Sequence, residues 1–180
     1  MQTVFRVVLT MMLVLSTSCI SDPEEPVWSL APGDRLPEFE VVAIDADGAR
    51  RQVSTTSLSG RPGVIVLFST GCADCRSELP VVNEAMLRAQ AAGVDASWLC
   101  ISRAEAEESV MAFWVEKKLS LPVSPQSDSE VYLKFASSII PRIYVYDSEG
   151  IIRQVYTDSP MPDAEMLFHA LQEVVGGKHP

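Results

Sequence analysis

Apolar residues along the chain fall into short runs, and the spacing of these runs predicts strands that alternate with helices. The runs at 64–68 and 96–101 are almost wholly apolar, which is typical of strands buried on both faces of a sheet. Two further pairs of segments flank short turns that contain Asp and Gly, which predicts two hairpins. The expected strands are 38–44, 50–53, 64–68, 96–101, 143–146 and 151–156.

Helices are expected where apolar residues recur at helical spacing. The segment 76–92 places its apolar residues on one side of a helix. Ser102 with Glu105, and Ser127 with Glu130, both match a capping box, so we expect a helix to begin at each of these serines. The expected helices are 76–92, 102–118, 127–136 and 163–175. This order of elements predicts an α/β domain whose sheet is partly parallel.

The first 18 residues have the pattern of a signal peptide and not of a folded element. Arg6 is the only charge before Cys19, and an apolar run too short to span a membrane leads into small residues just before that cysteine. The pattern resembles a bacterial lipobox, in which the cysteine is lipidated and becomes the mature N-terminus. Plain secretion with an incidental Cys19 is the alternative. The acidic, Pro-rich stretch 19–37 is predicted to be an extended tether, and the domain is predicted to occupy 38–176.

Composition narrows the possible functions. The chain has 180 residues, of which 47% are hydrophobic and 21% charged, as expected for one folded domain. A net charge of −10 without any cluster of basic residues argues against nucleic acid as a partner. Four cysteines are too few for a disulfide scaffold, and two histidines leave little for a metal site. The positions of the cysteines therefore matter more than their number.

Cys72 and Cys75 carry the candidate chemistry. They form a C-x-x-C directly after a predicted buried strand and at the start of a predicted helix. Unpaired backbone N–H groups and the helix dipole at such a position stabilise a thiolate, which is the nucleophile in disulfide exchange. The context therefore predicts a redox-active dithiol. A static structural disulfide and half of a zinc site are the alternatives, but zinc needs further ligands at suitable spacing, and no metal is expected.

A family resemblance agrees with this interpretation. V-I-V-L-F-S-T-G-C-A-D-C-R-S-E-L-P at 64–80 resembles the active-site segment of thioredoxin-like thiol:disulfide oxidoreductases of the TlpA/ResA type. P-G-D-R-L-P-E-F at 32–39 and I-I-P-R-I-Y-V-Y-D-S-E-G at 139–150 extend the resemblance over most of 32–176. It implies a thioredoxin-like fold, with a central mixed β-sheet flanked by helices and an N-terminal β-hairpin extension. Members of this family are exported, membrane-anchored bacterial proteins.

The resemblance also implies a role for each residue of the site. Cys72 would be the nucleophile, Cys75 the buried resolving cysteine, and Glu78 an acid that tunes thiol protonation from one helical turn away. Pro141 would be the cis-proline that faces the C-x-x-C, and the backbone around Ile140 would pair with an extended client strand. The alternatives are a surface acid for Glu78 and an ordinary trans proline at 141.

The sequence departs from the family pattern at the dithiol itself. Gly71 stands where Trp is usual, and Ala73 and Asp74 stand where a proline is common between the cysteines. We expect Ala73 and Asp74 to contact the client, and the negative charge of Asp74 disfavours a neighbouring thiolate, so the redox potential stays open. Cys100 lies in an apolar strand and is expected to be a core thiol and not a third redox cysteine.

These observations predict an exported, lipid-anchored thiol:disulfide oxidoreductase that reduces disulfides in client proteins. Its expected partners are clients with disulfides or thiols, the membrane, and a membrane electron donor or thiol reductant. We expect a monomer without a cofactor other than its own redox disulfide. The alternatives are a thiol peroxidase and a non-catalytic thioredoxin-fold binding module. Ser69 fits the peroxidase pattern, but Ile65 stands where that pattern requires a proline.

Overall fold

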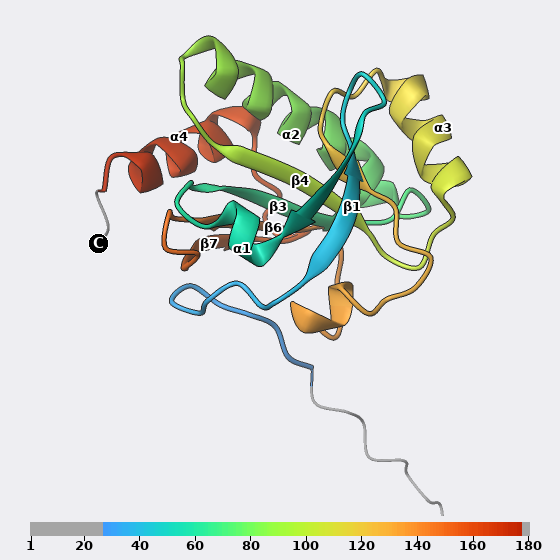
Figure 1. The fold of residues 1–180 in the computed structure, drawn as a ribbon, viewed down its shortest axis with the longest axis horizontal. Helices are drawn as coiled ribbons and strands as arrows, with labels where there is room; N and C mark the ends of the chain where they lie inside the picture. The colour runs from blue at the N-terminus through green and yellow to red at the C-terminus, as the bar shows by residue number, and fades with distance from the viewer. Residues whose placement is uncertain (1–26, 178–180) are drawn as a thin grey trace, which may run out of the picture.

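The computed structural model describes residues 27–177, and it places one seven-stranded mixed sheet between layers of helices and loops (Figure 1). The order of the strands is β2-β1-β5-β4-β3-β6-β7, and the expected α/β fold is confirmed. The signal peptide and the lipidation of Cys19 lie outside the described residues. The strands are β1 (Glu40–Ile44), β2 (Arg50–Ser54), β3 (Gly63–Phe68), β4 (Ser97–Ser102), β5 (Val123–Ser124), β6 (Arg142–Tyr146) and β7 (Ile152–Tyr156).

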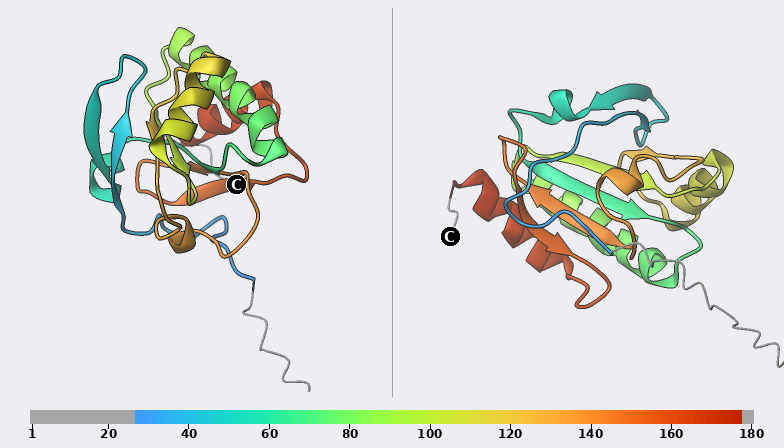
Figure 2. Two further views of the ribbon diagram at one scale, coloured as in Figure 1. Left: turned by 90° about the vertical axis from the view of Figure 1, so that its right-hand side faces the viewer. Right: turned by 90° about the horizontal axis from the view of Figure 1, so that it is seen from below.

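The strand that the apolar run at 64–68 predicted lies inside the sheet, between two neighbouring strands. Every residue of β3 is buried, and β3 pairs in parallel with β4 and antiparallel with β6. Three helices, α2 (Ala73–Ala91), α3 (Glu107–Lys117) and α4 (Ala164–Val175), pack their apolar residues on one face. The other face is covered by α1 (Thr55–Leu58), the 3₁₀ turn η1 (Tyr132–Lys134) and the N-terminal part of the chain (Figure 2). A strand enclosed in this way has no polar side, which explains its unbroken apolar run.

Two helix starts differ from those that the capping boxes predicted. Ser102 is the last residue of β4, and α3 begins only at Glu107. The side chain of Glu105 bonds to Thr70, in the loop after β3, and caps no helix. No helix begins at Ser127, since η1 starts at Tyr132. A capping box is a local pattern, and at the first of these two places tertiary hydrogen bonds use its polar residues: Ser102 accepts from Gln126, and Glu105 accepts from Thr70.

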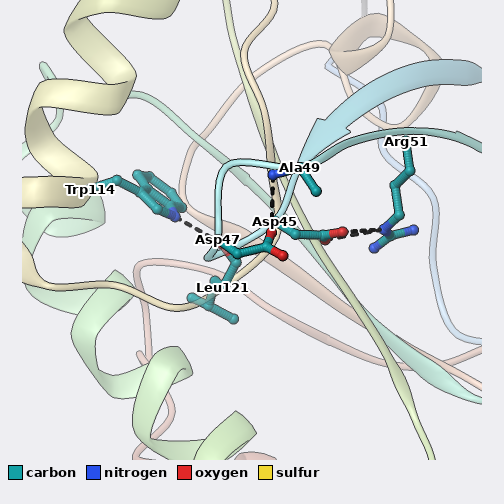
Figure 3. A network of polar contacts seen from close by, with 6 residues as sticks. All are labelled: Asp45, Asp47, Ala49, Arg51, Trp114 and Leu121. Atoms are coloured by element: carbon teal, nitrogen blue, oxygen red, sulfur yellow. Dashed lines mark hydrogen bonds and ion pairs between the residues drawn. The ribbon is translucent and has the colours of Figure 1, made fainter.

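The predicted N-terminal hairpin is present and extends the sheet beyond β5. In its turn the Asp45 carboxylate accepts from Arg51 Nε at 3.1 Å, and Asp47 accepts from the backbone N–H of Ala49 at 3.0 Å (Figure 3). In the same region Trp114 of α3 donates its indole N–H to the Leu121 carbonyl at 2.8 Å, which fixes the loop before β5. With only two residues, β5 left no pattern in the sequence to find.

The N-terminal segment 28–37 belongs to the domain, which corrects the predicted tether boundary at 37. Ser29 forms an isolated bridge with Ala136, and Arg35 forms another with Ile151. Leu36 is buried in the core on the face of the sheet that α1 and η1 cover. The segment is Pro-rich, as a tether would be, but its backbone groups find partners on the domain, so it is held there. Across residues 27–177, no helix has the length and apolarity to cross a membrane.

Candidate active site

The C-x-x-C occupies the first turn of α2, where β3 ends. The helix begins at Ala73, earlier than predicted, and Cys72 is its N-cap residue. The sulfur of Cys72 accepts from the backbone N–H of Cys75 at 3.4 Å, as an N-cap side chain does. The N–H of Cys72 in turn bonds to the Ser69 carbonyl at 3.1 Å, which closes a tight turn before the helix. Cys72 and Cys75 are free thiols in this structure.

The two cysteines have different surroundings, as the resemblance implied. Cys72 is half-buried, whereas Cys75 has no exposed surface. Burial raises the pKa of the Cys75 thiol far above its ordinary value, and a backbone hydrogen bond to Ser69 offsets only part of this rise. Cys75 is therefore a protonated thiol at neutral pH, and it needs a proton acceptor before it can act as a nucleophile.

Glu78 is a buried acid, so the alternative of a surface carboxylate is wrong. It lies one helical turn after Cys75, and only 3% of its surface is exposed. Its Oε1 atom has no hydrogen-bond partner among the described residues. Desolvation raises the pKa of Glu78 to about 7, so this carboxyl exchanges protons near neutral pH.

The loop before β6 lies against the dithiol. The Ile140–Pro141 peptide bond is cis, as predicted, and the Ile140 carbonyl oxygen lies 3.7 Å from the sulfur of Cys72. Tyr132 Oη donates to the Ile139 carbonyl at 3.1 Å, and Arg142 Nε donates to the Ser138 carbonyl at 3.0 Å. These two bonds fix the carbonyls that precede Ile140. The loop backbone beside Cys72 is therefore fixed in place by hydrogen bonds from Tyr132 and Arg142.

Glu105 is a residue of the site that sequence reasoning missed. Its Oε2 accepts from the backbone N–H of Thr70 at 2.9 Å, and its Oε1 accepts from the Thr70 hydroxyl. On the other side of Thr70, Arg76 Nη1 donates to its carbonyl at 3.4 Å. The Arg76 guanidinium itself lies over the ring of Phe113, 4.9 Å from the ring centroid. Thr70, two places before Cys72, is thus held from both sides, by Arg76 six residues away and by Glu105, which lies 35 residues away and which no local pattern connects to it.

The remaining predicted residues fall into two groups. Ala73 and Asp74 are exposed on the first turn of α2 beside Cys72, where a client could contact them. Cys100 has no exposed surface, and burial raises its pKa, which confirms the expectation of a core thiol. Among residues 27–177, no group of three or more His, Cys, Asp or Glu side chains is arranged to hold a metal ion.

Comparison with known proteins agrees with this geometry. The model of the AhpC/TSA family matches residues 32–155, a range that contains every residue of the site. The chain belongs to the AhpC/TSA family. Within the curated proteins it is 22% identical, over 154 residues, to the thiol-disulfide oxidoreductase ResA of Oceanobacillus iheyensis, covering 84% of this chain and 79% of that protein. The predicted resemblance to proteins of the ResA type is thereby confirmed.

Several solved structures superpose on this chain and have the same fold. A thiol:disulfide interchange protein of the thioredoxin family from Chlorobium tepidum superposes with a TM-score of 0.65 at 21% identity, covering 83% of this chain and all of that one (100%). A secreted thiol-disulfide isomerase from Corynebacterium glutamicum superposes with a TM-score of 0.67 at 17% identity, covering 87% and 95%. The thioredoxin-like fold is therefore shown.

Proposed function

We propose that the protein is an exported thiol:disulfide oxidoreductase that reduces disulfides in client proteins and is anchored by a lipid on Cys19. The observation that carries the redox part is the asymmetry of the dithiol. The sulfur of Cys72 is accessible at a helix start and lies 3.7 Å from the Ile140 carbonyl, whereas Cys75 is fully buried behind it. One accessible and one enclosed sulfur are what a two-step exchange requires.

In the first step the Cys72 thiolate attacks one sulfur of a client disulfide. A mixed disulfide forms between Cys72 and the client, the client S–S bond breaks, and the second client sulfur leaves as a thiolate that takes a proton from water. In the second step Cys75 attacks the sulfur of Cys72. The mixed disulfide breaks, and the Cys72–Cys75 disulfide forms. The client sulfur leaves as a thiolate that takes a proton from water, so the client has gained two electrons and carries two thiols. A membrane electron donor or thiol reductant then returns two electrons to the protein.

Glu78 serves the second step as the acceptor of the Cys75 proton. The raised pKa of Cys75 makes its proton hard to lose to water, and Glu78 lies one turn away in the same buried helix face. A carboxylate whose pKa is about 7 can take that proton and release it later at neutral pH. The buried side of α2 thus carries both the protected thiol, Cys75, and the base that accepts its proton, Glu78.

The backbone at Ile140 and Pro141 is the proposed client-binding edge. The carbonyl of Ile140 points at the attacking sulfur, and its neighbours are held by Tyr132 and Arg142. An extended client segment can pair with such an edge by backbone hydrogen bonds, which makes binding tolerant of the client sequence. Ala73 and Asp74 complete this surface on the side of α2.

An insulin-reduction assay with a dithiol donor tests the redox proposal. Wild type is expected to be active, and Cys72→Ala and Cys75→Ala to be inactive, whereas Cys100→Ala serves as the matched cysteine control and retains activity. Equal activity of wild type and both site variants would refute the proposal. Peroxide consumption in the same series tests the peroxidase alternative, and loss of that activity only in Cys72→Ala would favour it.

Export and anchoring are tested separately. Relatives such as the secreted isomerase of Corynebacterium glutamicum support export. We expect the mature protein to begin at an acylated Cys19, and this is measured by mass spectrometry of the N-terminal peptide. Cys19→Ala is expected to move the protein from the membrane fraction to the soluble fraction. A mature N-terminus at any other residue would refute the lipid anchor and leave the redox proposal intact.

A further inference from the structure

The chain joins the domain beside the proposed client-binding edge. The backbone N–H of Trp28 donates to Ser137 Oγ at 2.9 Å, and the N–H of Ser137 donates to the Trp28 carbonyl at 2.9 Å. Ser137 lies three residues before Ile140, whose carbonyl is 3.7 Å from the sulfur of Cys72. The first described residues lie on the half of the molecule where α2 begins, and α4 ends on the opposite side (Figure 2).

The tether is short enough to keep this part of the molecule close to its anchor. Eight residue steps separate Cys19 from Val27. A fully extended chain covers at most about 3.6 Å for each step, so Val27 lies within about 29 Å of a lipidated Cys19. By the same measure, Ser137 lies within about 11 Å of Ile140. A lipidated Cys19 therefore keeps the start of the domain, at Val27, within about 29 Å of the bilayer surface.

Four apolar side chains are exposed on the two segments that the hydrogen bonds between Trp28 and Ser137 bring together. Val27 is 73% exposed, Trp28 43%, Leu133 50% and Ile139 45%. Leu133 belongs to η1, the turn whose following residues pair with the chain just after Trp28. A gathering of exposed apolar residues marks a contact surface, and Trp is favoured at the boundary of a bilayer. We call Val27, Trp28, Leu133 and Ile139 the tether-root patch.

We propose that the tether-root patch rests on the bilayer to which Cys19 is anchored, so that the dithiol works at the membrane surface. This inference depends on the lipid anchor of the proposed function. Anchoring makes the contact intramolecular, which raises its effective concentration and lets a small apolar patch stay occupied. The orientation brings Cys72 to disulfides and electron donors that are themselves at or in the membrane.

Tryptophan quenching by brominated lipids tests this orientation. Trp98 and Trp114 are buried, at 6% and 4% exposure, so only Trp28 is accessible to a quencher in the lipid. The lipidated protein is placed in phosphatidylcholine vesicles with and without brominated acyl chains. Neutral lipid is used because the chain has a net charge of −10 and anionic lipid would repel it. We expect bromination to lower the emission, and we expect Trp28→Phe to abolish this loss.

Two further variants in the Trp28→Phe background complete the test. Leu133→Trp lies in the tether-root patch and is expected to be quenched. Val175→Trp is the matched control, since Val175 is 47% exposed in the last turn of α4, and it is expected not to be quenched. Equal quenching at 133 and 175 would overturn the orientation. Absence of quenching at both 28 and 133 would also overturn it.

The membrane orientation and the dithiol chemistry can be refuted independently of each other. Insulin reduction in solution is measured for the same variants, which lie outside the catalytic and client-binding residues, and all are expected to retain activity. Loss of quenching with retained activity overturns only the orientation. A Cys19 without an acyl chain overturns the orientation and the anchor together, and the dithiol chemistry stands.

Discussion

Replacing Glu78 by Gln removes an acid that the folded protein buries and whose Oε1 has no hydrogen-bond partner within residues 27–177. Glu78 is 3% exposed, and desolvation raises its pKa from 4.5 to about 7. Gln has nearly the same shape and cannot ionise. The substitution therefore removes the pH dependence that Glu78 contributes and keeps the packing of α2.

The size and sign of the effect follow from the pKa in the two states. Below pH 4.5 the carboxyl is protonated in both the folded and the unfolded chain, and its burial adds no ionisation cost. Between pH 4.5 and 7 the unfolded chain releases the proton while the folded chain keeps it, so the free energy of unfolding falls. A rise of about 2.5 pKa units, at about 1.4 kcal/mol for each unit, makes this loss about 3 kcal/mol above pH 7.

Urea unfolding of the reduced protein between pH 5 and pH 8 measures this loss. We expect the free energy of unfolding of Glu78→Gln, relative to that of wild type, to rise with pH and to level off above pH 7. Most of the difference of about 3 kcal/mol should be gained between pH 5 and pH 8. Glu84→Gln, an exposed acid on the same helix, is the control and should give a difference that does not change with pH. A flat difference for Glu78→Gln would refute the buried acid and, with it, the proposed acceptor of the Cys75 proton.

Three further predictions concern the cysteines and Glu105. In the reduced protein an alkylating agent is expected to modify Cys72 and to leave Cys75 protected, because only Cys72 is accessible; equal labelling by peptide mass mapping would contradict this. Glu105→Ala leaves the Thr70 N–H without its acceptor, so we expect a stability loss of about 1–3 kcal/mol in urea and slower alkylation of Cys72. Glu105→Gln keeps an acceptor and should restore the alkylation rate; a rate as low as that of Glu105→Ala would contradict a positioning role for Glu105. Cys100→Ala should cost about 1–3 kcal/mol of stability, by thermal or urea unfolding, and leave insulin reduction unchanged; an activity loss would give Cys100 a redox role.

The sequence by itself determined six of the seven strands, the main helices and the position of the dithiol. Continuous apolar runs such as 64–68 can only be buried on both faces, and this makes them central strands in any compact arrangement of the chain. The C-x-x-C was equally readable, because the strand before it and the helix after it are local patterns. Pro141 and Glu78 were found through family resemblance, and only the structure decided that Glu78 is buried.

Tertiary structure decided whatever depends on partners far apart in the chain. Glu105 forms part of a capping-box pattern in the sequence, yet its carboxylate bonds to Thr70, 35 residues away. The Pro-rich segment before residue 38 has the composition of a tether, yet Trp28 pairs with Ser137, 109 residues away, and so brings the start of the domain to the active site. The physical reason is the same in both cases. A polar side chain or an unpaired backbone group takes the best hydrogen-bond partner that the folded chain brings near, and only the packing of the sheet determines which partner that is.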